Sequence, residues 1–402
     1  MQLQTILKGP TDDLVAEDRF PLVSGFQGDP LEEESYLLLS RYDGDLKNSV
    51  VELVDLQTFE VLHKWNPDLD YINSLVDTTN PEFEFLHRDR NEDRYQIVNP
   101  LLLDDGGLVF NAMESPLVKV DFCSELVWQN QEDNFHHGIE QDEDGNIWVP
   151  TFMFPYALDR KYVGADYDNY KDDAITKVSA DGHILYQKSV SEIFIENNME
   201  YLLTSLGDRS FDNDPIHLND IQPVLRNSDY WKKGDVFLSI REQSMIMLYR
   251  PSQNAIVWIG TGHTFEQHDV DILDDHRISI FDNNTKVFYD GGRQVDGHNN
   301  VIIYDFKNDE YSSYMDAILD KHEVRTITEG RSQILGNGHL FIEETNYART
   351  LYFGKDGTLL WQHVNRAANG NVYFTQWSRI LYQDSDIKKV RNILASEKCE
   401  ND

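Results

Sequence analysis

A short strand–turn–strand pattern recurs along this chain of 402 residues and restricts its fold more than any other feature. Each copy has an apolar strand, a turn such as DDG or GNG, a second strand, and a third strand ending in a form such as DGTLLW. Turn-forming residues between short β-branched and aromatic runs are typical of stacked hairpins. The clearest copy spans residues 332–364, and five others begin near Ser35, Leu101, His137, Ile221 and Val270.

Units of about 35 to 50 residues with three or four strands each have the size of propeller blades. Radial closure of such units removes most exposed sheet edges. The repeats therefore predict an all-β fold, a six-bladed β-propeller over residues 35–385 that forms a single domain. Residues 1–34 are interpreted as an N-terminal extension and 386–402 as a C-terminal helix and tail. The segment that starts at Asn371 is expected to supply a strand that closes the ring with the first blade.

Two insertions interrupt the regular spacing of the predicted strands. They account for the few helices that we expect. Residues 152–172 are rich in aromatic side chains, and residues 190–212 contain an amphipathic helical pattern with Ser191 as its expected N-cap. Long insertions between strands are either functional lids or tolerated surface loops. Both interpretations remain open for these two segments.

The formal net charge of −36 limits the partners that this chain can bind. Such a charge repels nucleic acids and anionic membrane surfaces, so neither is an expected partner. An anionic substrate would need a local basic site.

The two cysteines and the N-terminus bear on the cellular compartment. Cys123 and Cys399 lie far apart in sequence, and Cys399 is in a polar tail, so no disulfide is expected between them. The first 20 residues lack the apolar run of a signal peptide, and no later stretch approaches about 18 consecutive apolar residues. A cytoplasmic location is therefore the expectation for the sequence as written.

Three expected blades begin with a histidine motif. These motifs are NFHHGIEQ, DPIHLNDIQPV and EQHDVDIL, and they contain His137, His217 and His268. The inner strands of a propeller line its axis, so we expect the three imidazoles to converge there. Arg241 ends a strand of the same blade as His217, and a guanidinium can hold an anion through several donors. Each of these residues alone could have a purely structural role. The histidines, however, precede the first strand of their blades at a similar distance, which favours an active site on the propeller axis.

The same segments resemble a known family. HHGIEQDEDGNIWV, IHLNDIQPV, FLSIREQSMIMLYRP and QHDVDILDDHRISIFDNN are similar to successive signatures of the arylsulfotransferases, and SQILGNGHLFIEE with GKDGTLLWQ resembles their last blade. The resemblance covers roughly residues 98–380. It implies a six-bladed propeller that moves a sulfuryl group from a phenolic sulfate ester to another phenol without a nucleotide donor.

The resemblance also implies roles for individual residues. His268 matches the family's nucleophile, and the supporting residues match His137, His217, Asn219 and Arg241, with His136 as the nearest alternative to His137. HHG here departs from the HHD-like form of the first motif.

The chemistry agrees with these roles. Sulfuryl transfer needs donors for peripheral oxygens, and a neutral imidazole can form a covalent N–S intermediate. Either His217 or His137 could take the proton of the acceptor phenol, and these two alternatives stay open. Asp269 is interpreted as structural, because adjacent strand residues point to opposite faces.

The expected ligands are an aryl sulfate donor and a phenolic acceptor, with no cofactor and no metal. His136 and the aromatic side chains Phe152, Phe154 and Tyr156 are the candidate substrate-binding residues, and Tyr162 and Tyr167 lie in the same loop. A homo-oligomer is possible. Many arylsulfotransferases are exported and carry an additional N-terminal β domain, and neither feature is recognised here.

Two other functions fit parts of the sequence. The first is a metal-dependent propeller hydrolase or lactonase, with Asp220, Asn219, Glu140 and His268 as possible ligands. The second is a non-catalytic propeller that binds a partner or a polysaccharide through its aromatic loops. Resistance to a chelator would separate sulfuryl transfer from the first alternative.

Overall fold

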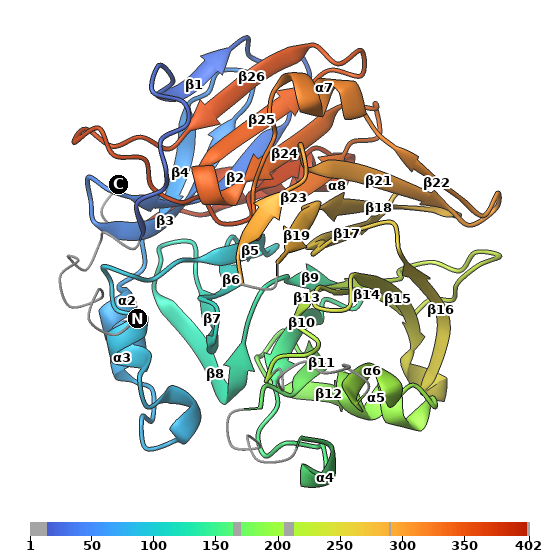
Figure 1. The fold of residues 1–402 in the computed structure, drawn as a ribbon. Coiled ribbons are helices and arrows are strands. Elements are labelled where there is room, and N and C mark those ends of the chain that lie inside the picture. The colour runs from blue at the N-terminus through green and yellow to red at the C-terminus, as the bar shows by residue number, and fades with distance from the viewer. Residues whose placement is uncertain (1–13, 164–169, 205–212, 289–290, 400–402) are drawn as a thin grey trace. The chain divides into compact units, whose positions relative to one another are not determined.

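The structure is a computed structural model that describes residues 14–163, 170–204, 213–288 and 291–399 (Figure 1). The chain forms two compact units, one made of Met1–Gln131 with Glu329–Asp402 and the other of Glu132–Thr328. The described elements are mostly strands joined by short turns, which makes the fold all-β and propeller-like.

The first unit has thirteen of the described strands, counting β8, which continues into the second unit. They are β1 (Gly25–Gly28), β2 (Tyr36–Asp43), β3 (Asn48–Asp55), β4 (Val61–Trp65), β5 (Val98–Leu102), β6 (Leu108–Asn111), β7 (Ser115–Val120), β8 (Leu126–Phe135), β23 (Arg331–Ile334), β24 (Leu340–Glu344), β25 (Arg349–Phe353), β26 (Leu359–Val364) and β27 (Arg379–Leu381). Its helices are α2 (Leu69–Ser74), α3 (Leu86–Asp89) and α8 (Asp384–Ser396), with 3-10 turns at Pro81–Phe83 and Thr345–Tyr347.

The second unit contains the three histidine motifs. Its strands are β9 (Glu140–Gln141), β10 (Ile147–Phe152), β11 (Asp173–Val178), β12 (Ile184–Ser189), β13 (Leu218–Pro223), β14 (Val236–Ile240), β15 (Met245–Arg250), β16 (Ala255–Thr261), β17 (Asp269–Ile272), β18 (Arg277–Asp282), β19 (Thr285–Val287), β20 (Arg293–Val295), β21 (Asn300–Asp305) and β22 (Glu310–Ser313). Its helices are α4 (Arg160–Val163), α5 (Val190–Glu196), α6 (Tyr201–Thr204) and α7 (Asp316–Lys321), with a 3-10 turn at Pro251–Gln253.

The prediction of six separate blades is wrong. Four sheets have the four or five strands of one blade: β27-β2-β3-β4, β13-β14-β15-β16, β17-β18-β21-β22 and β1-β26-β25-β24-β23. The strands of the other two expected blades belong to one sheet of eight, because they share β8. Residues 130–135, expected to connect two blades, continue β8 and pair with β10 at Phe135↔Thr151 and Asn134↔Phe152.

The C-terminal segment completes the first sheet, as predicted. Strand β27 pairs antiparallel with β2, with Tyr36 opposite Leu381 and Leu38 opposite Arg379. The N-terminal extension adds a strand that the sequence did not indicate, because β1 pairs with β26 from Gly25↔Val364 to Gly28↔Trp361. Edges that would otherwise remain open in two sheets of this unit are therefore paired.

The predicted amphipathic helix begins two residues early and is interrupted. Ser189, not Ser191, is the N-cap, and its hydroxyl accepts a hydrogen bond from the backbone N–H of Glu192 at 3.2 Å. The helix α5 ends at Glu196, and α6 is a separate short helix. Ser191 is fully buried and pairs instead with the hydroxyl of Tyr170 at 2.6 Å.

The expectation about the cysteines is also wrong. Cys123 and Cys399 form a disulfide across a sequence separation of 276 residues. Cys123 lies in the turn between β7 and β8, and Cys399 follows α8, whose Val390 and Ile393 pack into the core of the same unit. The large sequence separation gave no indication of this disulfide, because the two cysteines become neighbours only when the unit folds.

The described helices include none with the length and hydropathy required to cross a membrane. In the second unit the apolar side chains gather in two clusters, one centred on β13 to β15 with α5 and one on β14, β17, β18 and β21. Strands β13 and β17 of these clusters begin directly after His217 and His268. The core of the second unit thus holds two of the three histidine motifs.

Candidate functional site

The three histidine motifs share one backbone feature. His137, His217 and Glu266 adopt positive φ angles of 55°, 52° and 56°, a conformation that non-glycine residues rarely take. Such backbone outliers cluster at functional sites, where the surrounding structure holds them. By this backbone feature His137 and His217 occupy equivalent positions in their motifs. His268 and Asn219 share a second position, because each lies two residues beyond a residue with positive φ, Glu266 or His217.

The imidazoles of the motifs lie close together. The ring centroid of His137 is 5.0 Å from that of His136, 5.1 Å from that of His217 and 6.3 Å from that of His268. His136, His137 and His268 are almost completely buried. The histidines that the sequence singled out are therefore neighbours within the second unit.

Hydrogen bonds connect each motif to the next. The backbone N–H of Gly138 donates to the carbonyl of Asn219 at 3.0 Å, and the side-chain amide of Asn219 donates to the carbonyl of Gln267 at 3.0 Å. A Cβ atom on Gly138 would lie 2.4 Å from Oδ1 of Asp220, which is too close for any side chain. This contact gives a physical reason for HHG, because an aspartate at position 138 would collide with Asp220.

Asp173, the first residue of β11, holds two of the motifs. Its carboxylate accepts hydrogen bonds from the backbone N–H groups of His217 at 3.0 Å and Leu218 at 3.1 Å. Oδ1 also lies 3.3 Å from Nε2 of His136. Burial raises the pKa of Asp173. A fully buried carboxylate with these neighbours stabilises the positive φ at His217.

His136 and His217 each contact a different side chain through Nδ1. Nδ1 of His136 lies 2.7 Å from Nδ1 of His137, so one of the two nitrogens donates to the other. Nδ1 of His217 lies 2.7 Å from Oδ2 of Asp214. Although burial opposes it, the hydrogen bond from His217 lowers the pKa of Asp214, so Asp214 faces this imidazole as a carboxylate.

His268 has neutral hydrogen-bond acceptors at Nδ1. That nitrogen lies 2.7 Å from Oδ1 of Asn283 and 3.0 Å from the carbonyl of Glu266. Burial, and then the positive charge of Arg241, hold the pKa of His268 well below the usual value of a histidine. The imidazole is therefore neutral at physiological pH and has the protonation state of a nucleophile.

His137 is also held neutral. Burial, followed by the neighbouring imidazoles of His136, His217 and His268, lowers its pKa well below the usual value. Any positive charge that develops on one of these rings is opposed by charge on the others, because the rings lie close together. Proton transfers among them are therefore electrostatically coupled.

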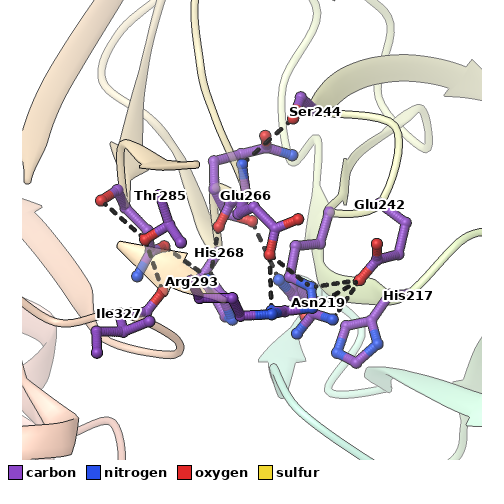
Figure 2. A network of polar contacts seen from close by, with 12 residues as sticks. His217, Asn219, Glu242, Ser244, Glu266, His268, Thr285, Arg293 and Ile327 are labelled. Atoms are coloured by element: carbon purple, nitrogen blue, oxygen red, sulfur yellow. Dashed lines mark hydrogen bonds and ion pairs between the residues drawn. The ribbon is translucent and has the colours of Figure 1, made fainter. Parts of the chain in front are cut away.

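Two arginines and two glutamates form a network beside the histidines (Figure 2). Arg241 contacts Glu242 through Nε at 3.0 Å and through a second, shorter contact, and its Nε lies 3.8 Å from Oε2 of Glu266. Arg293 donates to Oε2 of Glu266 at 2.7 Å and lies 3.7 Å from Oε1 of Glu242. Burial and the carboxylate of Glu242 raise the pKa of Glu266. The formal charges of the network cancel.

The aromatic residues of the first insertion are in different environments. The ring of Phe152 stacks on His136, with centroids 4.1 Å apart, and the ammonium of Lys171 lies 4.8 Å from its centre. Phe154 is 45% exposed and contacts Tyr156 at 5.5 Å. Tyr156 in turn contacts Tyr170, and Tyr167 lies outside the described residues. Phe152 is thus the aromatic candidate placed against the histidines.

The residues considered for a metal site are not the ones that have metal-binding spacing in the structure. Asp220 is buried, and burial followed by the charges of Asp269 and Glu140 raises its pKa well above the usual value. Among the described residues, the group of His, Asp and Glu side chains with metal-binding spacing is Asp274, Asp275 and His276, in the turn before β18. That group includes none of the residues proposed from the sequence.

Sequence reasoning missed several residues that support the histidines: Asp173, Asp214, Glu242, Glu266, Asn283 and Arg293. Some had a local signal. Asp214 lies three residues before His217 in DPIH, and Asn283 follows a strand in FDNN. Asp173 and Arg293 had none, since only pairing of distant segments places them beside the motifs.

The solved structures that are similar to this chain are distant from it in sequence. A protein of unknown function from Bacteroides caccae has 11% identity and a TM-score of 0.48, covering 82% of this chain and 94% of its own. Streptogramin B lyase has 11% identity and a TM-score of 0.41, covering 90% and 94%. The nidogen/laminin complex has 6% identity and a TM-score of 0.46, covering 86% and 98%. A search of curated protein sequences found no match.

A family comparison gives a more specific result. The profile of the arylsulfotransferase (ASST) family matches residues 99–366, about two thirds of the chain. The matched range contains all three histidine motifs, Arg241 and the ionic network. The chain therefore belongs to the arylsulfotransferase family.

Proposed function

We propose that the protein transfers a sulfuryl group from an aryl sulfate ester to a phenolic acceptor through a covalent intermediate on His268. The observation that carries the proposal is the fully buried imidazole of His268, which is held neutral beside Arg241. The imidazoles of His137 and His217 lie in the same cluster. A nucleophile, a base and a donor for anionic oxygens then occupy one site.

In the first step, the lone pair on Nε2 of His268 attacks the ester sulfur. An N–S bond forms as the S–O bond to the aryl group breaks, and the phenolate oxygen leaves with the electron pair. In the second step, the oxygen of the acceptor phenol attacks the same sulfur, and the N–S bond returns its pair to Nε2. The acceptor's proton passes to a neighbouring imidazole, His217 or His137.

Arg241 and Asn219 hold the peripheral oxygens in this proposal. Charge accumulates on these oxygens in a loose transition state, where preorganised donors are most effective. The amide nitrogen of Asn219 carries two N–H groups, and one of them is bound to the carbonyl of Gln267. That bond fixes the direction of the second. Arg241 must share its donors between the substrate and Glu242, and Arg293 offsets part of that carboxylate charge.

His136 and Phe152 are proposed to form one wall for an aryl ring. Their stacked rings lie beside His137 and present an aromatic surface next to the cluster. Phe154 and Tyr156 extend this surface toward solvent in the same loop.

Incubation with an aryl sulfate and a phenol tests the function. Phenol release and acceptor sulfation should both occur, and intact-mass analysis should show one sulfuryl adduct, increased by His217→Ala if the second step slows. His268→Asn should abolish both, whereas His263→Asn should not, because His263 is exposed and stacks on Tyr311. Activity should survive a chelator. Absence of both turnover and adduct in the wild-type protein would refute the proposal.

A further inference from the structure

The partner of His268 differs in kind from that of another imidazole in the cluster. Nδ1 of His217 faces the carboxylate of Asp214, whereas Nδ1 of His268 faces the neutral amide of Asn283. A carboxylate beside an imidazole stabilises its cationic form. An amide oxygen can only accept a hydrogen bond. The nucleophile of the proposed reaction therefore has the less basic partner.

The orientation of the Asn283 amide is determined by its other contact. Its Nδ2 donates to the backbone carbonyl of Thr326 at 3.2 Å, which leaves Oδ1 directed at Nδ1 of His268 at 2.7 Å. The second neighbour of Nδ1 is the carbonyl of Glu266 at 3.0 Å (Figure 2). Both neighbours are acceptors, so Nδ1 must carry the proton, and the lone pair of the neutral ring is on Nε2.

Asn283 is itself held in place by a second asparagine. Nδ2 of Asn299 donates to the carbonyls of Asn283 at 2.7 Å and Thr326 at 2.9 Å, and Oδ1 of Asn299 accepts from the N–H of Thr326 at 2.5 Å. Both asparagines are fully buried. Side chains locked in this way keep the groups that they contact in one geometry.

We infer that Asn283 is the positioning residue that fixes His268 as the Nε2 nucleophile and keeps its sulfurylated form reactive by leaving the Nδ1 proton in place. This inference rests on the proposed function. With Nδ1–H retained, the N–S bond joins sulfur to an imidazolium ring, and its cleavage returns the electron pair to a neutral imidazole. That imidazole is a good leaving group for the acceptor phenol to displace.

A carboxylate at position 283 would change this chemistry. It would stabilise the imidazolium of the sulfurylated ring by charge attraction, and that stabilisation would be lost as the N–S bond breaks and the ring becomes neutral. The second step would slow while the first remained possible. The carboxylate would also raise the affinity of the free ring for protons, so that protonated, non-nucleophilic His268 would accumulate near neutral pH.

The tautomer can be measured without any activity. In wild-type protein with ¹⁵N-labelled histidine, long-range nitrogen–proton correlation should show His268 with a protonated Nδ1 and an unprotonated Nε2 at pH 7. A protonated Nε2 with a bare Nδ1 would overturn the inference even if sulfuryl transfer is found. If transfer is absent but the tautomer is as stated, the proposed function fails and the positioning role of Asn283 stands.

Kinetics of Asn283→Asp test the second half of the inference. We expect acceptor sulfation at pH 7 to fall at least tenfold, the sulfuryl adduct to accumulate, and the donor step to become pH-dependent between pH 6 and 8. The matched control is Asn284→Asp, because the Asn284 amide donates to the carbonyls of Asp296 and His298 and not to His268. Equal loss in both variants, or loss without adduct accumulation and pH dependence, would overturn the role in reactivity. If Asn283→Asp does not fold, the wild-type tautomer still decides the positioning role.

Discussion

Replacing Gly138 with alanine tests whether the first histidine motif is fixed by close packing against the second. The new Cβ would lie 2.4 Å from Oδ1 of Asp220, about 1 Å inside ordinary contact, and 3.1 Å from the carbonyl of Asn219. Asp220 is buried and accepts from the N–H of Val270 at 3.2 Å, so it has little room to move. Overpacking of this kind costs about 1 to 3 kcal/mol of unfolding free energy.

Urea denaturation and donor kinetics measure both consequences. With an m-value of about 2 kcal/mol/M, the unfolding midpoint of the second unit should fall by about 0.5 to 1.5 M. A displacement of His137 or Asn219 by about 1 Å should lower kcat/KM by roughly 100-fold. Gly138→Asp should be worse, because it adds a second carboxylate beside Asp220.

The matched control for this prediction is Gly336→Ala. The nearest atom to its Cβ would be a ring carbon of Tyr382 at 3.9 Å, which is ordinary contact. If Gly138→Ala has the midpoint and the kcat/KM of Gly336→Ala, the packing argument for the HHG motif is refuted.

Three further predictions follow from other parts of the chain. Arg241→Gln should lower kcat/KM for an aryl sulfate by about 10- to 100-fold, the effect of losing a charged hydrogen bond of about 1.5 to 3 kcal/mol, and a change below about threefold would contradict its role. Cys123→Ser should lower the unfolding free energy by about 2 to 4 kcal/mol under non-reducing conditions, with a reductant reproducing the loss in wild type and changing nothing in the variant. Burial lowers the pKa of His363 to about 4 from 6.5, so between these pH values the unfolded chain binds a proton that the folded chain does not. The unfolding free energy should therefore fall by about 3 kcal/mol from pH 6.5 to 4, and pH-dependent melting of His363→Phe should lack this contribution.

The repeats predicted the strands and much of the candidate site. The units contain their expected strands, β27 pairs with β2, and the three histidine motifs meet because local turn chemistry and hydrophobic patterning determine each strand end. The predicted number of separate blades was wrong because the sequence at a repeat boundary does not show whether a strand continues through it. Residues 130–134 are polar, but backbone pairing with β10 does not depend on side-chain hydropathy.

The supporting residues were harder to predict for a physical reason. Asp173 contacts His136 and His217 across sequence separations of 37 and 44 residues, and Arg293 reaches Glu266 from another hairpin. Such contacts depend on tertiary geometry and leave no periodicity in the chain. The disulfide is the extreme case, because its two halves are far apart until the first unit has formed.

The pairing of β27 with β2 has a consequence for synthesis of the chain. The partner of Tyr36 is Leu381, so the ribosome must release all residues up to Leu381 before the sheet of β2 to β4 gains its last strand. Until then the hydrogen-bonding edge of β2 is open to other nascent chains, which is a hazard during translation. The segment Glu132–Thr328 depends on no terminus and can fold while the ribosome is still adding residues. We therefore expect the second unit to finish folding before the first unit does.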